Sequence, residues 1–173
     1  IKIPKIQENI RKRDIFIIQS VSATPQYNLN DLMMELFVLI DAIQRGSATS
    51  IRVILPVFPY QRQDRKDYSR APISSKMIAS FLETQGVDRV ITFDLHAGQI
   101  QGFFDKTRLD NIYSEPYFIH YIKTVLLSKI SPDNLVIVSP DEGGVKTATR
   151  VADKLNCAAA ILYKERAAPG CIN

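Results

Sequence analysis

The sequence predicts an α/β protein built on a mostly parallel sheet. Short apolar runs rich in Ile, Val and Phe alternate with longer amphipathic stretches, which is the pattern of repeated βα units. Apolar residues make up 46% and charged residues 23% of the 173 residues, so the chain can bury a core. This composition excludes wholesale disorder, a collagen-like chain and a long coiled coil.

Each expected strand is a short apolar run, and each expected helix carries apolar residues at helical spacing. The expected strands cover residues 15–19, 51–57, 89–93, 135–138 and 158–163. The expected helices cover residues 30–44, with Asn30 as the N-cap, 74–84, ended by Gly86, 115–127 and 144–155. The βα pattern restarts at Ser114-Glu115-Pro116, so we expect a first domain over residues 1–114 and the start of a second over 115–173.

Charge and cysteine content narrow the function classes. Lys and Arg number 22 against 18 acids, and the net charge of +4 suits phosphate ligands but is small for a nucleic-acid binder. Cys157 and Cys171 are too few for a disulfide framework, no signal-peptide pattern is present, and no apolar run could cross a bilayer. We expect a cytoplasmic protein without membrane or nucleic-acid partners. Because the chain starts at Ile1 without an initiator Met, we also expect it to be a piece of a longer protein.

Polar residues follow four of the expected strands. In an open parallel sheet, ligands bind beyond the carboxyl ends of the strands, where loops converge and helix N-termini point inward. The segments at this position are residues 58–72, 94–99, 139–144 and 164–166, and they carry cations, carboxylates, an imidazole and a Gly-Gly pair. We expect them to face one crevice.

The first two segments each have two interpretations. Arg62 and Gln63 stand between Tyr60 and Asp64, which would suit a stacked base and a polyphosphate, but a solvated loop has the same composition. His96 could share a hydrated Mg²⁺ with Asp94 or be oriented by it, but a histidine near a strand end can also be structural.

Each of the other two segments, taken alone, also has two interpretations. Asp141, Gly143 and Gly144 could bind a phosphate and a metal at a helix start, or they could simply form a turn and a cap. The run Gly144-Val145-Lys146-Thr147 lacks the P-loop spacing, because Val145 occupies the place of the second glycine. Lys164-Glu165-Arg166 could be an ordinary exposed strand end. No zinc-site spacing and no nucleophile elbow occurs in the sequence.

Taken in order, these segments resemble the ribose-phosphate diphosphokinases, also called phosphoribosyl pyrophosphate (PRPP) synthetases. The resemblance runs from about Asp14 onward and rests on a series of short motifs. They are Phe58-Pro59-Tyr60, Arg62-Gln63-Asp64, Ser69-Arg70-Ala71-Pro72-Ile73-Ser74, Asp94-Leu95-His96-Ala97, Gln99-Ile100-Gln101-Gly102-Phe103-Phe104-Asp105, Asp110-Asn111-Ile112-Tyr113, Glu115-Pro116, Ser139-Pro140-Asp141, Gly143-Gly144 and Lys164-Glu165-Arg166. The resemblance implies two phosphoribosyltransferase-like domains of three layers, both incomplete here.

The resemblance also implies an activity: transfer of the β,γ-diphosphate of ATP to the 1-hydroxyl of ribose 5-phosphate, with Mg²⁺ required. The implied ATP-binding residues are Arg62, Gln63, Asp64, Asp67 and His96. The implied metal ligands are His96 and Asp141, and the implied phosphate and substrate loop contains Asp141, Gly143 and Gly144. The implied catalytic residues are Lys164 and Arg166, on a loop that closes over the phosphates, and His96. Homodimers that assemble into hexamers are implied as well.

Departures from the family pattern leave alternatives. The family's upstream Phe-x-Asn-x-Glu segment and its downstream Asp-Asp-x-x-Asp-Thr-x-x-Thr loop are not in this sequence, so we expect the chain alone not to make PRPP. Residues 106–109 form a turn one residue longer than usual, Glu142 replaces a small residue, and residues 167–170 replace a basic stretch. The alternative is a non-catalytic PRPP-synthetase-associated subunit, which shares the fold but alters the catalytic motifs. Retention of the motifs around Arg62, His96, Asp141 and Lys164 argues against it. A PRPP-consuming phosphoribosyltransferase is disfavoured, because its PRPP loop is missing.

Overall fold

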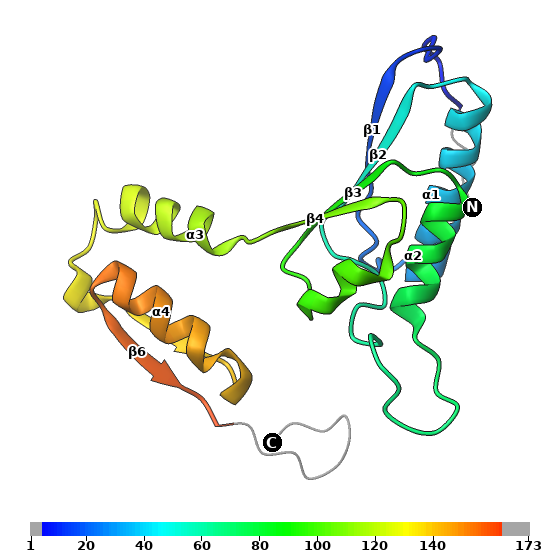
Figure 1. The fold of residues 1–173 in the computed structure, drawn as a ribbon. Coiled ribbons are helices and arrows are strands. Elements are labelled where there is room, and N and C mark those ends of the chain that lie inside the picture. Colours follow the sequence, from blue (N-terminus) through cyan, green and yellow to red (C-terminus); the bar gives the residue numbers. More distant parts are fainter. Residues whose placement is uncertain (1–4, 164–173) are drawn as a thin grey trace. The chain divides into compact units, whose positions relative to one another are not determined.

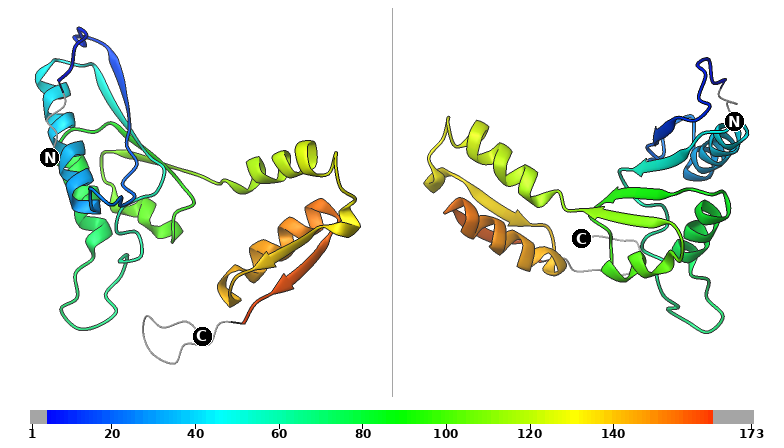
Figure 2. Two further views of the ribbon diagram at one scale, coloured as in Figure 1. Left: turned by 180° about the vertical axis from the view of Figure 1, so that it is seen from behind. Right: turned by 45° about the horizontal axis from the view of Figure 1, so that its top comes forward.

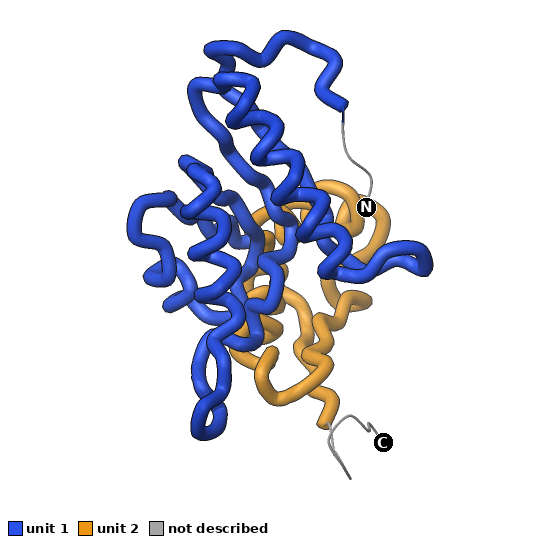
Figure 3. Tube along the Cα trace, turned by 90° about the vertical axis from the view of Figure 1, so that its right-hand side faces the viewer, with its two compact units in different colours: residues 1–113 blue, residues 114–173 orange. Residues whose placement is uncertain are grey.

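A computed structural model describes residues 5–163, which fall into two compact units. Unit 1 comprises Ile1–Tyr113 and unit 2 comprises Ser114–Asn173 (Figure 3). The expected division into two domains stays a prediction, because a compact unit need not fold alone. Within residues 5–163, no helix is both long and apolar enough to cross a membrane.

Unit 1 is a four-stranded sheet with two long helices (Figure 1). Its elements are β1 (Asp14–Ile18), α1 (Leu29–Arg45), β2 (Ser50–Leu55), α2 (Ser74–Thr84), β3 (Arg89–Phe93), the 3₁₀ helix η1 (Gly98–Phe103) and β4 (Arg108–Ile112). The strands lie in the order β1-β2-β3-β4, and every neighbouring pair is parallel. The mostly parallel α/β fold that the sequence predicts is confirmed.

The core of unit 1 lies between one face of the sheet and the two helices (Figure 2). Ile51, Val53 and Leu55 alternate along β2 with side chains that remain partly exposed, so β2 turns one face to the core. Leu36 of α1 and Leu82 of α2 are fully buried in the same cluster. Burying each such side chain stabilises the fold by about 1.5–3 kcal/mol. This core therefore holds the carboxyl ends of β2 and β3 in fixed register.

The start of α1 differs from the expectation, because Asn28 and not Asn30 is the N-cap. The Asn28 side chain accepts hydrogen bonds from the N–H groups of Asn30, at 2.8 Å, and Asp31, at 3.1 Å. The Asp31 carboxylate accepts in return from the Asn28 N–H at 3.0 Å. Only Asn28 has an acid three residues further on, so only Asn28 can form this reciprocal capping box.

The strand β4 was missed by the sequence analysis. Its residues include Asp110 and Asn111, which interrupt the apolar run that would have indicated a strand. Pairing with β3 fixes the segment as a strand, and Arg89 of β3 forms an ion pair with Asp110 of β4. A strand at the edge of a sheet tolerates such polar residues, because it is covered less completely.

Unit 2 contains one parallel βαβ unit. Its elements are α3 (Glu115–Tyr121), the π turn η2 (Ile122–Leu126), the 3₁₀ turn η3 (Pro132–Asn134), β5 (Val136–Ser139), the 3₁₀ turn η4 (Glu142–Gly144), α4 (Val145–Leu155) and β6 (Ala158–Ile161). The strands β5 and β6 pair in parallel. The expected helix over 115–127 changes to π geometry after Tyr121, where the Thr124 hydroxyl donates to the His120 carbonyl at 2.9 Å and competes with the regular helix bonds. The helix expected from residue 144 begins one residue later, at Val145.

Candidate functional site

Two of the four predicted polar segments leave the sheet of unit 1 side by side. Residues 56–73 follow β2 and residues 94–97 follow β3, and these two strands are parallel neighbours. Both segments therefore emerge at the same edge of the sheet, as expected for a ligand site.

The segment after β2 is anchored by its aromatic residues. Phe58 is 1% exposed, and its ring packs edge-on against Phe104 with 6.0 Å between centroids. The Tyr60 hydroxyl donates a hydrogen bond to the Asn30 side chain of α1. A recess of about 360 Å³, bounded by Val21, Leu29 and residues 57–62, opens beside this anchor. Its largely apolar lining would suit the face of a planar ring.

Two side-chain hydrogen bonds join the segments after β2 and β3. The Gln61 Oε1 atom accepts from the His96 N–H at 2.8 Å. The Gln99 Nε2 atom donates to the Asp64 Oδ2 atom at 2.7 Å. Each of these hydrogen bonds joins residues that are 35 positions apart in the sequence. Together they hold the loop that contains the predicted ATP-binding residues Arg62, Gln63 and Asp64 beside the loop that contains His96.

The predicted ATP-binding residues differ in how free their side chains are. Within residues 5–163, the exposed Arg62 guanidinium makes no recorded ion pair or hydrogen bond, and the same holds for the exposed His96 imidazole. The Gln63 carbonyl accepts from the N–H and the hydroxyl of Ser75, at 3.2 and 3.0 Å, which fixes the backbone beside Arg62. The Asp67 carboxylate instead pairs with Arg65 at 3.1 Å. Arg62 and His96 are therefore free to meet a ligand, whereas Asp67 is engaged within its own loop.

The backbone before His96 has an unusual conformation. Asp94 has a φ of 43°, which is uncommon for a residue other than glycine. Its N–H donates to the Ile112 carbonyl at 3.0 Å, and the Leu95 N–H donates to the Asn111 side chain at 3.1 Å. The end of β4 thus holds the turn that presents His96, a role that is consistent with strain stored at a functional turn.

In unit 2, Asp141, Gly143 and Gly144 form the tight turn that precedes α4. The Asp141 Oδ1 atom accepts from the Gly144 N–H at 3.2 Å, and the buried Ser139 hydroxyl donates to the Asp141 carbonyl at 2.7 Å. A Cβ added at Gly144 would come within 2.6 Å of the Ser139 Oγ atom, so the turn requires glycine there. Turn and cap chemistry accounts for these contacts, and the phosphate role of the turn stays a prediction.

The predicted metal ligands are divided between the units: His96 lies in unit 1 and Asp141 in unit 2. In the described part of the chain, no three His, Cys, Asp or Glu side chains gather closely enough to hold a metal ion. Mg²⁺ usually takes one or two carboxylates and completes its shell with water and substrate phosphates. Asp141 fits that donor set, whereas the nitrogen ligand of His96 fits it poorly. The expectation that all four strand ends share one crevice stays a prediction, and Lys164 and Arg166 lie outside the described residues.

Sequence reasoning gave no separate role to three residues that build the site. Gln61 and Gln99 link the two loops, and Asn111 supports the turn before His96. All three are amides near strand ends, and Gln99 and Asn111 also belong to motifs on which the family resemblance rests.

Comparisons with known proteins agree on one family. A family model described as the N-terminal domain of ribose phosphate pyrophosphokinase matches residues 2–86. Ribose-phosphate pyrophosphokinase A of Dictyostelium discoideum is 52% identical over 161 residues, which are 93% of this chain and 48% of that protein. Ribose-phosphate pyrophosphokinase of Fusobacterium nucleatum is 46% identical over 95% of this chain and 50% of its own length.

A solved structure gives the same result. The crystal structure of phosphoribosylpyrophosphate synthetase from Mycobacterium smegmatis superposes with a TM-score of 0.76 at 40% identity. The match covers 94% of this chain and 52% of that one. The chain therefore belongs to the ribose-phosphate pyrophosphokinase family and spans about half the length of the curated relatives it matches.

Proposed function

We propose that the whole protein containing this chain is a ribose-phosphate diphosphokinase. It transfers the β,γ-diphosphate of ATP to the 1-hydroxyl of ribose 5-phosphate, giving PRPP and AMP. The observation that carries the proposal is the pair of loops after β2 and β3, which the Gln61–His96 and Asp64–Gln99 hydrogen bonds join. Arg62 lies in the first of these loops, and its guanidinium has no partner among residues 5–163. Membership in the family supports the same reaction, and retention of these residues argues against a non-catalytic associated subunit.

In this reaction the ribose O1 atom attacks the β-phosphorus of ATP. The bond from the β-phosphorus to the oxygen bridging to the α-phosphorus breaks, that oxygen leaves with AMP, and the proton of the hydroxyl is released. Catalysis of such a transfer comes mainly from positioning and from neutralising charge on the phosphates.

The residues of unit 1 divide this work. The Arg62 guanidinium provides a planar fork of donors for ATP phosphate oxygens. Gln63 adds an amide beside it, and the recess near Tyr60 receives the base. The Gln61 contact holds the backbone of His96 so that its imidazole can donate to the phosphates. Asp64, through Gln99, keeps the two loops at a fixed spacing.

The remaining roles belong to the second half of the site. Mg²⁺ would be held by the Asp141 carboxylate and by phosphate oxygens, and it would supply positive charge to the diphosphate. Lys164 and Arg166 would stabilise the charge that develops on the transferred group. Assembly into dimers and hexamers and a cytoplasmic location are parts of the same proposal, the latter supported by the presence of only two cysteines.

The test is AMP formation from ATP and ribose 5-phosphate with Mg²⁺ by the whole protein. Arg62→Ala should raise the KM for ATP, because Arg62 contacts phosphates in both the ground and transition states. Lys164→Ala should lower kcat by roughly 10²- to 10³-fold with little change in ATP affinity. Arg45→Ala, which removes an exposed arginine paired with Asp41, is the control and should leave both constants unchanged. Absence of AMP formation, or a Lys164→Ala enzyme with normal kcat, would contradict the proposal.

A further inference from the structure

A second recess, with a strongly charged lining, lies at the opposite edge of the sheet of unit 1, where β2, β3 and β4 begin. Its volume is about 480 Å³. Four cations and two carboxylates line it, namely Arg52, Arg89, Lys106, Arg108, Glu83 and Asp88. None of these residues belongs to the loops after β2 and β3, so the recess is distinct from the candidate ATP site.

Three of the arginines form a row across the sheet. Strand register pairs Arg52 of β2 with Arg89 of β3, and Arg89 with Arg108 of β4. Neighbouring strands are about 4.8 Å apart, so the row spans about 10 Å on one face of the sheet. Like charges placed directly opposite one another destabilise a sheet. The row therefore costs stability unless counter-charges offset it.

Internal counter-charges cover only part of the row. Arg52 pairs with Asp14 at 3.4 Å and also lies over the Phe16 ring, 5.1 Å from its centroid. Arg89 pairs with Asp110. Arg108 and Lys106 are exposed, and neither side chain has a recorded partner within residues 5–163.

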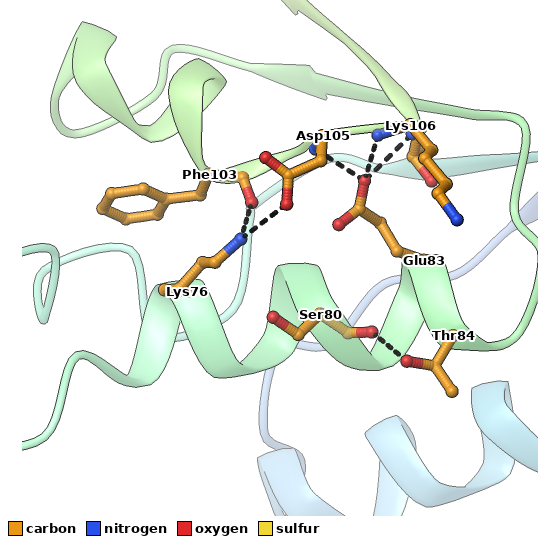
Figure 4. Close-up of polar contacts among 8 residues, drawn as sticks. Lys76, Ser80, Glu83, Thr84, Phe103, Asp105 and Lys106 are labelled. Carbon is orange, nitrogen blue, oxygen red and sulfur yellow. Dashed lines mark hydrogen bonds and ion pairs between the residues drawn. The ribbon is translucent and has the colours of Figure 1, made fainter.

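The two carboxylates of the recess are already engaged by the backbone. The Glu83 Oε1 atom accepts from the N–H groups of Asp105, Lys106 and Thr107 at 2.7 to 3.0 Å (Figure 4). Burial alone would raise the pKa of Glu83, but these N–H groups outweigh it and hold that pKa below its usual value. The Asp88 Oδ2 atom accepts from the Ile51 N–H at 2.7 Å. Within residues 5–163, neither acid forms an ion pair with Arg108 or Lys106.

We propose that this recess is a binding site for a small multivalent anion with phosphate chemistry, held by Arg108, Lys106 and the edge of the arginine row. Guanidinium groups are matched to phosphate oxygens by their planar, forked donors. The cations line a bounded hollow and not a long stripe, which favours a diphosphate-sized ligand over a nucleic-acid backbone.

The experiment titrates the ¹⁵N-labelled protein with sodium pyrophosphate at constant ionic strength and follows the backbone amide resonances. We expect saturable shifts at Gly86, Thr107 and Arg108. The double variant Lys106→Gln/Arg108→Gln should weaken this binding by at least about tenfold, because each lost charge-assisted hydrogen bond removes a large share of the affinity. Lys129→Gln, an exposed cation of unit 2, is the matched charge control and should bind normally.

Three outcomes would overturn the proposal. The first is pyrophosphate shifts confined to residues 61–64 and 94–99, which would assign the binding to the candidate ATP site. The second is unchanged affinity in the double variant. The third is a shift of the recess amide resonances on addition of a DNA oligonucleotide but not on addition of pyrophosphate. Arg108→Gln alone serves as the second variant. The Arg108 side chain is exposed and has no partner within residues 5–163, so its replacement should not unfold the sheet. A thermal melt checks the stability of this variant.

Discussion

Glu115 offers a sharp test of what holds unit 2 together. It begins α3, and its carboxylate accepts from the Arg150 Nε atom, at 2.9 and 3.1 Å, and from the Lys154 Nζ atom at 2.9 Å. Its side chain is only 15% exposed, whereas those of Arg150 and Lys154 are about half exposed. Hydrogen bonds from Arg150 and Lys154 lower the pKa of Glu115 to about 2. The carboxylate therefore fastens α3 to α4.

The magnitude follows from this pKa. A lowering of the Glu115 pKa from its ordinary value of 4.5 to about 2 corresponds at most to about 3.4 kcal/mol of stability at neutral pH. The half-exposed partners are screened by solvent, which reduces the contribution to about 1–2 kcal/mol. Because the folded-state pKa is depressed, this stability is present above about pH 4.5 and is lost as the pH falls towards 2. We expect Glu115→Gln to lower the free energy of unfolding of unit 2 by that amount at pH 7.

The assay is urea denaturation followed by NMR at the methyl groups of Ala148 and Ala152, two buried residues of α4. Measurements at several pH values between 2.5 and 7 should show the wild-type and Glu115→Gln stabilities converging at the acidic end. Asp153→Asn, an exposed acid of the same helix, should change stability by less than about 0.5 kcal/mol. A difference between wild type and Glu115→Gln that stays constant over this range would refute the electrostatic origin.

Three further predictions concern the site loops and their supports. Asp64→Ala removes the acceptor of the Gln99 hydrogen bond, so amide hydrogen exchange should quicken in residues 94–99 and in the loop after β2. Gly144→Ala should destabilise unit 2 by about 1–3 kcal/mol in urea, because the new Cβ would overlap the buried Ser139 hydroxyl. Thr107→Val leaves a buried carbonyl unpaired and should cost unit 1 about 1–3 kcal/mol in the same assay.

Each of these predictions has a matched control. Gln101→Ala breaks only a local hydrogen bond to Gly98 and should leave loop exchange unchanged. Gly143→Ala meets its nearest atom at 3.3 Å and should cost less than Gly144→Ala. Thr84→Val removes an exposed hydroxyl and should be nearly neutral. If the controls matched the test variants, the contacts named above would not be the cause of the effects.

The sequence predicted those elements whose signal is local. The strands β2 and β3 are short runs rich in Ile, Val, Leu and Phe. The helix α2 was predicted with the bounds observed, because its apolar stripe ends near a glycine with a φ of 67°. The strand β4 was not predictable in this way, because Asp110 and Asn111 acquire their strand geometry from pairing with β3. The capping box at Asn28 was visible in the sequence, but two asparagines competed for one cap.

The site was predictable in its location but not in its connections. The rule that ligands bind at the carboxyl ends of parallel strands identified the segments containing Arg62 and His96. The Gln61–His96 hydrogen bond joins positions 35 residues apart, and nothing in the local sequence of either residue indicates the other. The contact depends on β2 and β3 being neighbours, which is a property of sheet order.

The same reasoning explains why the arginine row escaped the sequence analysis. Arg52, Arg89 and Arg108 each stand at or near the start of a strand, where a single arginine is an ordinary solvated residue. They lie far apart in the sequence, and one of them belongs to the strand that was missed. Only the register of β2, β3 and β4 aligns them. A shift of one residue in β4 would turn Arg108 to the opposite face of the sheet, because side chains alternate along a strand. The row is therefore a consequence of register alone. Arg108 at its end and the neighbouring Lys106 form no ion pair within residues 5–163, and this is the reason to expect an anion there.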